Sequence, residues 1–412
     1  MISRALHLFI VLTAAVTFLL LGAGGLVTSH GVGMAVPDWP NTFGYNMFFF
    51  PVSQWVGGVF YEHTHRLLAS GVGLLTTIIA LWLHGKGARP FLRWTGLVLL
   101  VLGVGTALAV PKHWTDALVL GLSGLVGLAA SFAWPRNDPP APWLRRLGLL
   151  AFGAVVLQGV LGGLRVVLFK DQIGIFHATL AQLFFVLLCA LSLFTSPWWQ
   201  TRFVGAAVVP KSPKPSEGMV TLAWICGAAV LLILGQLILG ATMRHQHAGL
   251  AIPDFPLAYG KLWPAMDPQS VALYNQRRIE VVAANPITAF QIGLQMVHRL
   301  MAACILAAVA AAAWLAHRRL GSQHPVARFS LLWLGLILVQ AALGAFTIWS
   351  NKAADVATAH VLVGALSLAC GSIVSVVTLA LLKQSPEAAK RAASQPLRSS
   401  FTPRPSPAVG FE

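Results

Sequence analysis

Charged residues are scarce in this chain. Asp, Glu, Lys and Arg make up only 10% of its 412 residues, whereas 57% are hydrophobic. Because soluble globular domains carry about 25% charged residues, this composition excludes an ordinary water-soluble protein. Apolar runs of about 20 residues recur along the whole chain, which is typical of transmembrane helices.

Cysteine is scarce as well. The four cysteines all fall inside apolar runs and have no near neighbours of their own kind: Cys189, Cys226, Cys304 and Cys370. We therefore expect no disulfide framework and no thiolate metal site.

The apolar runs predict an all-α integral membrane protein with about ten transmembrane helices. The predicted spans are residues 5–29, 60–83, 92–110, 115–134, 147–168, 173–196, 219–241, 287–316, 327–349 and 354–382. Loops on one side of these spans hold most of the 28 Lys and Arg residues, so the positive-inside rule places both termini in the cytoplasm. The net charge of +16 therefore indicates topology and not nucleic-acid binding.

The chain also repeats itself. Four motifs occur twice in the same order: VPDWP at 36–40 with IPDFP at 252–256, EHTHRLLAS at 62–70 with QMVHRLMAA at 295–303, LQGVLGGLRV at 157–166 with VQAALGAFTI at 339–348, and FHATLAQLF at 176–184 with AHVLVGALS at 359–367. This order predicts a duplicated four-helix bundle unit, with an additional helical hairpin inserted into the first copy. The LQGVLGG match favours residues 147–168 over 92–110 as the third helix of that copy.

The repeat and the composition together predict the domain boundaries. The predicted parts are an N-terminal unit at 1–200 with its hairpin at about 92–134, a cytoplasmic linker at 201–218, a C-terminal unit at 219–382 and a disordered cytoplasmic tail at 383–412.

Histidines recur at matched positions. His65 and His177 of the first unit match His298 and His360 of the second, and all four lie just inside the outer ends of predicted helices. Polar groups at membrane depth are costly and usually functional. Each unit would offer two facing imidazoles on neighbouring helices, which is how haem iron is commonly ligated. A helix–helix hydrogen bond is the simpler alternative, and zinc is disfavoured because no third ligand recurs in both units.

One position differs between the copies. Glu62 stands three residues before His65, and Gln295 stands three residues before His298. Residues at i and i+3 share a helix face, so each side chain would lie beside its own bound group. Glu can exchange a proton and stabilise positive charge, which predicts a reactive first unit and a cofactor-holding second unit. A purely structural Glu62–Arg66 ion pair is the alternative.

Arg66 and Arg299 directly follow two of the histidines. A guanidinium group suits the carboxylates of haem propionates, but an Arg near a helix end also snorkels to lipid headgroups, so both roles stay open. Two prolines stiffen each PDWP or PDFP loop. We interpret these loops as lids over the two haem pockets, with ordinary interfacial loops as the alternative.

Taken together, the E-x-x-H-R motif at Glu62, His65 and Arg66, the two loops, and His177, His298 and His360 resemble the haem A synthase family over nearly the whole chain. The resemblance implies oxidation of a methyl group of haem O to a formyl group by successive oxygen-dependent hydroxylations. It assigns the substrate haem to His65 and His177, haem b to His298 and His360, and the catalytic carboxylate to Glu62.

Two features depart from the family pattern. Val36 and Ile252 stand where many members have a cysteine before the loop, and about ten spans exceed the usual eight. The resemblance also implies a bacterial inner membrane as the location, and haem O, the enzyme that produces it and an unidentified electron donor as partners. A homo-oligomer is compatible with it. The alternative function is a bis-histidine di-haem electron-transfer protein without catalysis.

Overall fold

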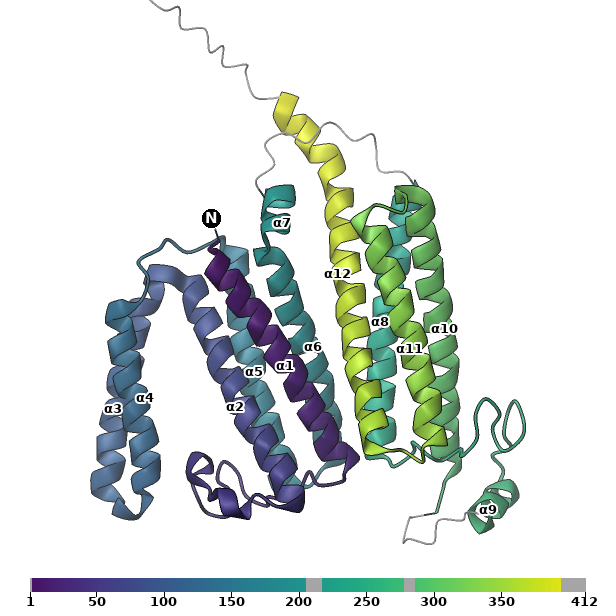
Figure 1. The fold of residues 1–412 in the computed structure, drawn as a ribbon, viewed down its shortest axis with the longest axis horizontal. Helices are drawn as coiled ribbons and strands as arrows, with labels where there is room; N and C mark the ends of the chain where they lie inside the picture. The colour runs from purple at the N-terminus through teal and green to yellow at the C-terminus, as the bar shows by residue number, and fades with distance from the viewer. Residues whose placement is uncertain (1, 205–216, 278–285, 394–412) are drawn as a thin grey trace, which may run out of the picture.

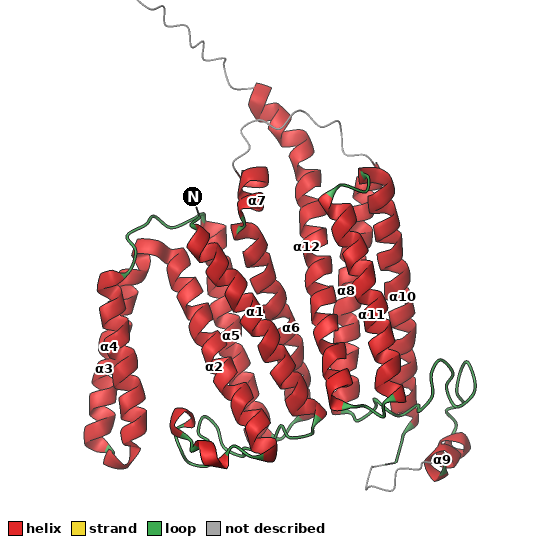
Figure 2. Ribbon diagram, viewed as in Figure 1, coloured by secondary structure: helices red, strands yellow, loops and turns green. Residues whose placement is uncertain are grey.

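The protein is all-α, as a computed structural model of residues 2–204, 217–277 and 286–393 shows. Within these residues, nine continuous helical stretches are long and apolar enough to cross a bilayer. One of them, Gly57–Ala109, contains two separate helices, α2 and α3. The predicted fold class, an all-α integral membrane protein, is therefore confirmed (Figure 2).

The first half of the chain forms a four-helix bundle. Its helices are α1 (Arg4–Ser29), α2 (Gly57–His84), α5 (Pro142–Leu168) and α6 (Asp171–Thr195). Each helix packs against two others, so that α2 and α6 lie diagonally across the bundle (Figure 1). Their apolar faces bury Ile10, Ile79 and Leu188 completely. In this bundle α5 takes the place of the third helix, as the LQGVLGG match predicts.

The second half repeats the arrangement. Its helices are α8 (Glu217–His245), α10 (Ala289–Leu320), α11 (Pro325–Trp349) and α12 (Ala354–Ala393), and here α10 and α12 are diagonal. The two bundles meet where α1 and α6 pack against α12 and where α6 packs against α8. Phe185 of α6 is buried there with Ala365 and Ala369 of α12.

The inserted hairpin stands beside the first bundle. Helices α3 (Ala88–Ala109) and α4 (Trp114–Ala133) pack mainly on each other, and the 3-10 turn Gly85–Gly87 joins them to α2 (Figure 1). Glycines let the two backbones approach closely, since a Cβ atom at Gly103 would lie 2.6 Å from the backbone nitrogen of Gly121. Such close contact through small residues is typical of helix pairs in membranes.

Shorter helical elements lie between the long helices. They are η1 (Met47–Phe49), η2 (Val52–Gln54), η4 (Pro111–His113), α7 (Pro197–Trp199), the π-helix η5 (Gln200–Val204) and α9 (Pro268–Gln276). The sequence interpretation missed α9, although Asp267 caps it and Pro268 begins it, two recognised start signals.

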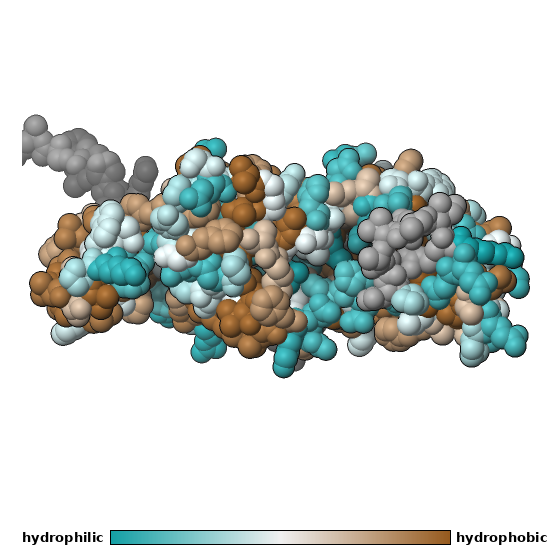
Figure 3. Space-filling view, turned by 90° about the horizontal axis from the view of Figure 1, so that it is seen from below, coloured by the Kyte–Doolittle hydropathy of each residue, from teal (hydrophilic) through white to brown (hydrophobic). Residues whose placement is uncertain are grey.

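The N-terminus and the end of α12 lie at one end of the molecule, and the PDWP and PDFP loops lie at the other (Figure 1). The loop end carries a mixture of hydrophilic and hydrophobic residues (Figure 3). Helix α12 continues to Ala393, past residue 383 where the predicted tail begins. Residues 205–216 and 394–412, which hold most of the predicted linker and tail, lie outside the described residues, and the domain boundaries stay a prediction.

Candidate functional site

The four matched histidines lie on diagonal helices of each bundle. His65 is on α2 and His177 on α6, whereas His298 is on α10 and His360 on α12. All four fall within the first three turns of their helices, at the loop end. The expectation of neighbouring helices is therefore wrong. The reason is the ring order of the bundle, in which α2 and α6 each contact α1 and α5.

Each histidine ring faces a glycine on the preceding helix of the bundle. A Cβ atom at Gly24 would lie 3.0 Å from Cε1 of His65, and one at Gly344 would lie 3.3 Å from Cε1 of His360. The corresponding distances are 3.4 Å between Gly162 and His177 and 3.5 Å between Gly240 and His298. The glycines therefore make the space in which all four rings are held at the same position.

Each of these four rings has one buried nitrogen atom without a hydrogen-bond partner. Nδ1 is buried without a hydrogen-bond partner in His65, His177, His298 and His360. A buried nitrogen without a partner is costly unless something outside the chain satisfies the ring. Unprotonated imidazole nitrogen is a good ligand for iron, so these residues fit a bound haem in each half.

A cavity of about 510 Å³ occupies the first bundle. This volume lies in the usual range of cofactor sites, about 300–1,000 Å³. His65, His177 and Glu62 all line it, and so do Trp39 and Pro40 of the PDWP loop together with Met47. Trp39 lies against α5, because a Cβ atom at Gly163 would lie 2.3 Å from its indole ring. The first loop therefore forms part of the cavity wall, and its role as a lid stays a prediction.

Glu62 and Gln295 make the same backbone contact. Oε2 of Glu62 accepts a hydrogen bond from the Val36 N–H at 2.9 Å, and Oε1 of Gln295 accepts one from the Ile252 N–H at 2.7 Å. Glu62 differs by a buried ion pair with Arg66, whose Nη2 lies 2.7 Å from Oε1. Both roles that the sequence left open for Glu62 thus meet in one place, since the paired carboxylate also lines the cavity.

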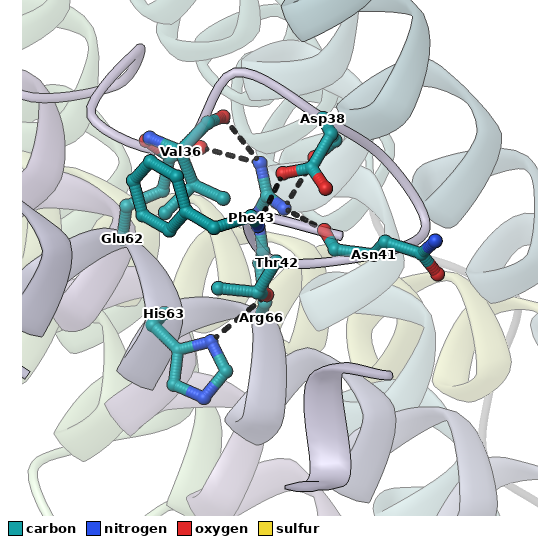
Figure 4. Close-up of polar contacts among 8 residues, drawn as sticks. All are labelled: Val36, Asp38, Asn41, Thr42, Phe43, Glu62, His63 and Arg66. Carbon is teal, nitrogen blue, oxygen red and sulfur yellow. Dashed lines mark hydrogen bonds and ion pairs between the residues drawn. The ribbon is translucent and has the colours of Figure 1, made fainter. Parts of the chain in front are cut away.

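The guanidinium of Arg66 holds the first loop (Figure 4). Besides Glu62 it donates to the carbonyl oxygens of Val36, Asp38 and Asn41 at 2.7–3.0 Å. Arg299 donates to the carbonyls of Asp254 and Leu257, which are the matching positions of the second loop. Loop anchoring is a third role that the sequence did not suggest for either residue, and contact with propionates stays a prediction.

The two loops have the same internal structure. Asp38 accepts hydrogen bonds from the N–H groups of Phe43 and Gly44, and Asp254 accepts them from Tyr259 and Gly260. The duplication is therefore visible in individual hydrogen bonds. His63, which the sequence analysis does not count among the ligands, is fully buried beneath the first loop with Nδ1 3.2 Å from Oγ1 of Thr42 (Figure 4).

The structure adds residues that sequence reasoning missed. Arg244 and His245, from the end of α8 in the second half, line the cavity of the first half. Arg165 of α5, whose match in the repeat is the uncharged Thr347, lines it as well. Gln158 and Gln236 donate to the backbone carbonyls of His177 and His298, at 3.0 and 2.9 Å. The third repeat motif pairs Gln158 with Gln340 and so marks Gln158, whereas no repeat motif includes Gln236.

Comparison with known proteins gives consistent results. The model of the cytochrome oxidase assembly protein family matches residues 112–371. A protein named Heme A synthase from Beijerinckia indica is 30% identical over 249 residues, which cover 57% of this chain and 62% of that relative, less than two thirds of its length. One of the same name from Rhizorhabdus wittichii is 26% identical over 374 residues, covering 89% of this chain and 92% of the relative. A third, from Symbiobacterium thermophilum, is 29% identical over 229 residues, covering 55% and 66%.

Proposed function

The chain belongs to the cytochrome oxidase assembly protein family, and from that premise we propose that it is a haem A synthase. It would oxidise a methyl group of haem O to a formyl group by successive oxygen-dependent hydroxylations followed by loss of water. The observation that supports this proposal best is the cavity of about 510 Å³ whose walls contain His65, His177 and Glu62 together.

Each pair of histidines would bind a different haem. In this proposal His65 and His177 hold the substrate haem, and His298 and His360 hold haem b. The buried, unpartnered Nδ1 atoms and the facing glycines favour a bound group at both pairs. When bound, haem b would supply one-electron redox chemistry.

Glu62 would act as a fixed negative charge. Removing electrons from a methyl carbon develops positive charge there, and an oriented carboxylate in a dry site stabilises that charge. Arg66 and the Val36 N–H hold the two carboxylate oxygens, so the charge stays in place as the substrate reacts. Trp39, Pro40 and Met47 would exclude water at the loop end of the cavity.

The proposed orientation places both termini in the cytoplasm and the loop end on the outer side of the bacterial cell membrane. Haem O, the enzyme that produces it and an electron donor are the proposed partners, and assembly into a homo-oligomer stays a proposal too.

The test is to express the full chain with a supply of haem O, extract the bound haems and separate them by chromatography. We expect haem A and haem b from the wild type. His298→Ala and His360→Ala should lose haem b, whereas His65→Ala and His177→Ala should keep haem b and make no haem A. His317→Ala, an exposed histidine near the far end of α10, is the matched control and should keep both.

A preparation that never contains haem A, and that loses haem b with either pair, would instead support the electron-transfer alternative. A colourless preparation would contradict both functions.

A further inference from the structure

The second half of the chain reaches into the cavity of the first. The last turn of α8 carries Arg244 and His245, and both line the cavity beside His177. His245 is 9% exposed, and a Cβ atom at Gly174 of α6 would lie 2.3 Å from its ring. Its Nδ1 lies 3.8 Å from Asp171 at the start of α6. Packing against α6 therefore fixes the end of α8 in the cavity wall.

Arg244 is held there by neutral groups. Its Nη2 donates to the Gly25 carbonyl of α1 at 2.9 Å and also to the hydroxyl oxygen of Ser29. Among the residues that the structure describes, no carboxylate pairs with it. Its position is therefore set, but its charge is not neutralised.

Arg165 is a second cation in the same wall. It is half-buried, and Nη2 lies 3.1 Å from the place that a Cβ atom at Gly33 would take. In the described part of the chain no hydrogen bond or ion pair is found for it. Lys352, in the loop before α12, is a third basic residue near Arg244. Burial is the larger cause, and the charge of Arg244 the smaller one, that lowers the pKa of Lys352.

The cavity thus holds more positive than negative charge. Glu62 is the carboxylate in its wall, and Arg66 already pairs with it. Placing unpaired charges away from water is costly, and a buried cation is expected to meet an anion. Two guanidinium groups that have no carboxylate partner among the described residues therefore favour a ligand with carboxylates at one edge.

We infer that Arg165 and Arg244 together bind the carboxylate edge of the ligand in the first-half cavity, so that the second half completes the site of the first. This inference rests on the proposed function and specifies it further, since a haem carries two propionates at one edge. Guanidinium groups bind carboxylates through paired, charge-assisted hydrogen bonds. Arg66 is less suited, because Glu62 already neutralises its charge, and Arg299 does not line this cavity.

The test uses two probes that differ only in their carboxylates. Iron protoporphyrin IX and its dimethyl ester are titrated into the purified full chain in detergent, and binding is followed by absorbance. Arg165→Gln and Arg244→Gln should each weaken binding of the acid by about tenfold or more, the size of one lost charged hydrogen bond, and leave binding of the ester unchanged. Arg318→Gln, at the opposite end of α10, removes the same charge and should change neither.

Two controls separate binding from folding. Arg244 also ties α8 to α1, so its variant could loosen the two halves, whereas Arg165 has no such bond among the described residues and reports on the charge alone. Arg244→Lys keeps the charge and should recover part of the preference for the acid. Equal losses for acid and ester, or no loss for either variant, would overturn the inference.

The outcome is also distinct from that of the proposed function. A chain that makes no haem A but prefers the acid through Arg165 and Arg244 would keep this binding site and refute the synthase. A chain that makes haem A while both variants keep the wild-type preference for the acid would support the synthase and refute this binding site. A wild type that binds neither probe would contradict both.

Discussion

Replacing Glu62 by Gln separates the two roles of this residue. The chain itself shows what the substitution should do, because Gln295 already occupies the matching position and accepts the Ile252 N–H at 2.7 Å. A Gln at position 62 can accept the Val36 N–H in the same way. The loop should therefore stay closed over the cavity, while the negative charge is lost.

The expected cost in stability is small and can be bracketed. Glu62→Gln removes one charge-assisted hydrogen bond to Arg66, in a pair whose side chains are 10% and 5% exposed. Such a bond contributes about 1.5–3 kcal/mol. Arg66 keeps three loop carbonyls as acceptors, so the lower part of that range applies. Glu62→Ala should cost about 1–3 kcal/mol more, because the buried Val36 N–H then loses its partner.

The assay combines thermal unfolding in detergent with chromatography of the extracted haems. We expect the order of stability to be wild type, Glu62→Gln and Glu62→Ala, with haem b kept in all three. Haem A formation should fall by about 100-fold or more in the Gln variant, the usual loss when a charge-stabilising group is removed. Gln295→Glu is the matched control and should not transfer activity to the second half. Wild-type amounts of haem A from Glu62→Gln would refute the chemical role and leave a loop anchor.

Two further predictions concern the supports of the site. Gly24→Ala should displace the His65 ring and lower haem A yield, since the new Cβ would lie 3.0 Å from the ring. Gly240→Ala should be tolerated, because its Cβ would lie 3.5 Å from the His298 ring. Equal haem spectra and yields for both variants would show that the glycines do not determine the positions of the histidine rings. Asp116→Ala should loosen the first loop from the hairpin, because Asp116 accepts a hydrogen bond from the side chain of Asn46 at 2.7 Å. Limited proteolysis should then cut residues 45–50 faster, and an unchanged rate would show that this hydrogen bond does not hold the loop.

Much of the fold was predictable because membrane helices can be recognised by the length and composition of their apolar runs. The repeats also identified the residues of both histidine pairs. The diagonal placement of His65 and His177 was not predictable, because spacing along the chain does not fix the ring order of a bundle. The role of Arg66 was hidden for another reason: its partners are backbone carbonyls, which every residue has, and only the folded loop brings three of them together.

Residues that act across the two halves were the hardest to find. Arg244 meets Gly25 and Ser29, more than 200 positions away in the sequence. No repeat or motif marks such a contact. The place of His245 is likewise not marked by any motif, because its surroundings are supplied by Asp171 and Gly174 of α6.

Three of the charged residues that line the first cavity, Glu62, Arg165 and Arg244, have uncharged counterparts in the other copy of the repeat, whereas Arg66 is matched by Arg299. Gln295 replaces Glu62, and Thr347 stands where Arg165 does in the third repeat motif. Gly24 and Gly240 face matching histidines, so α1 and α8 can be aligned on these two glycines. Four positions later, α1 has Thr28 and α8 has Arg244. A charge in a membrane bundle is retained only where something binds it or uses it. The shared loops, glycines and histidines would thus serve any bound porphyrin, whereas Glu62, Arg165 and Arg244 would supply what the proposed reaction needs in addition: a carboxylate near the reacting carbon and cations that orient the ring.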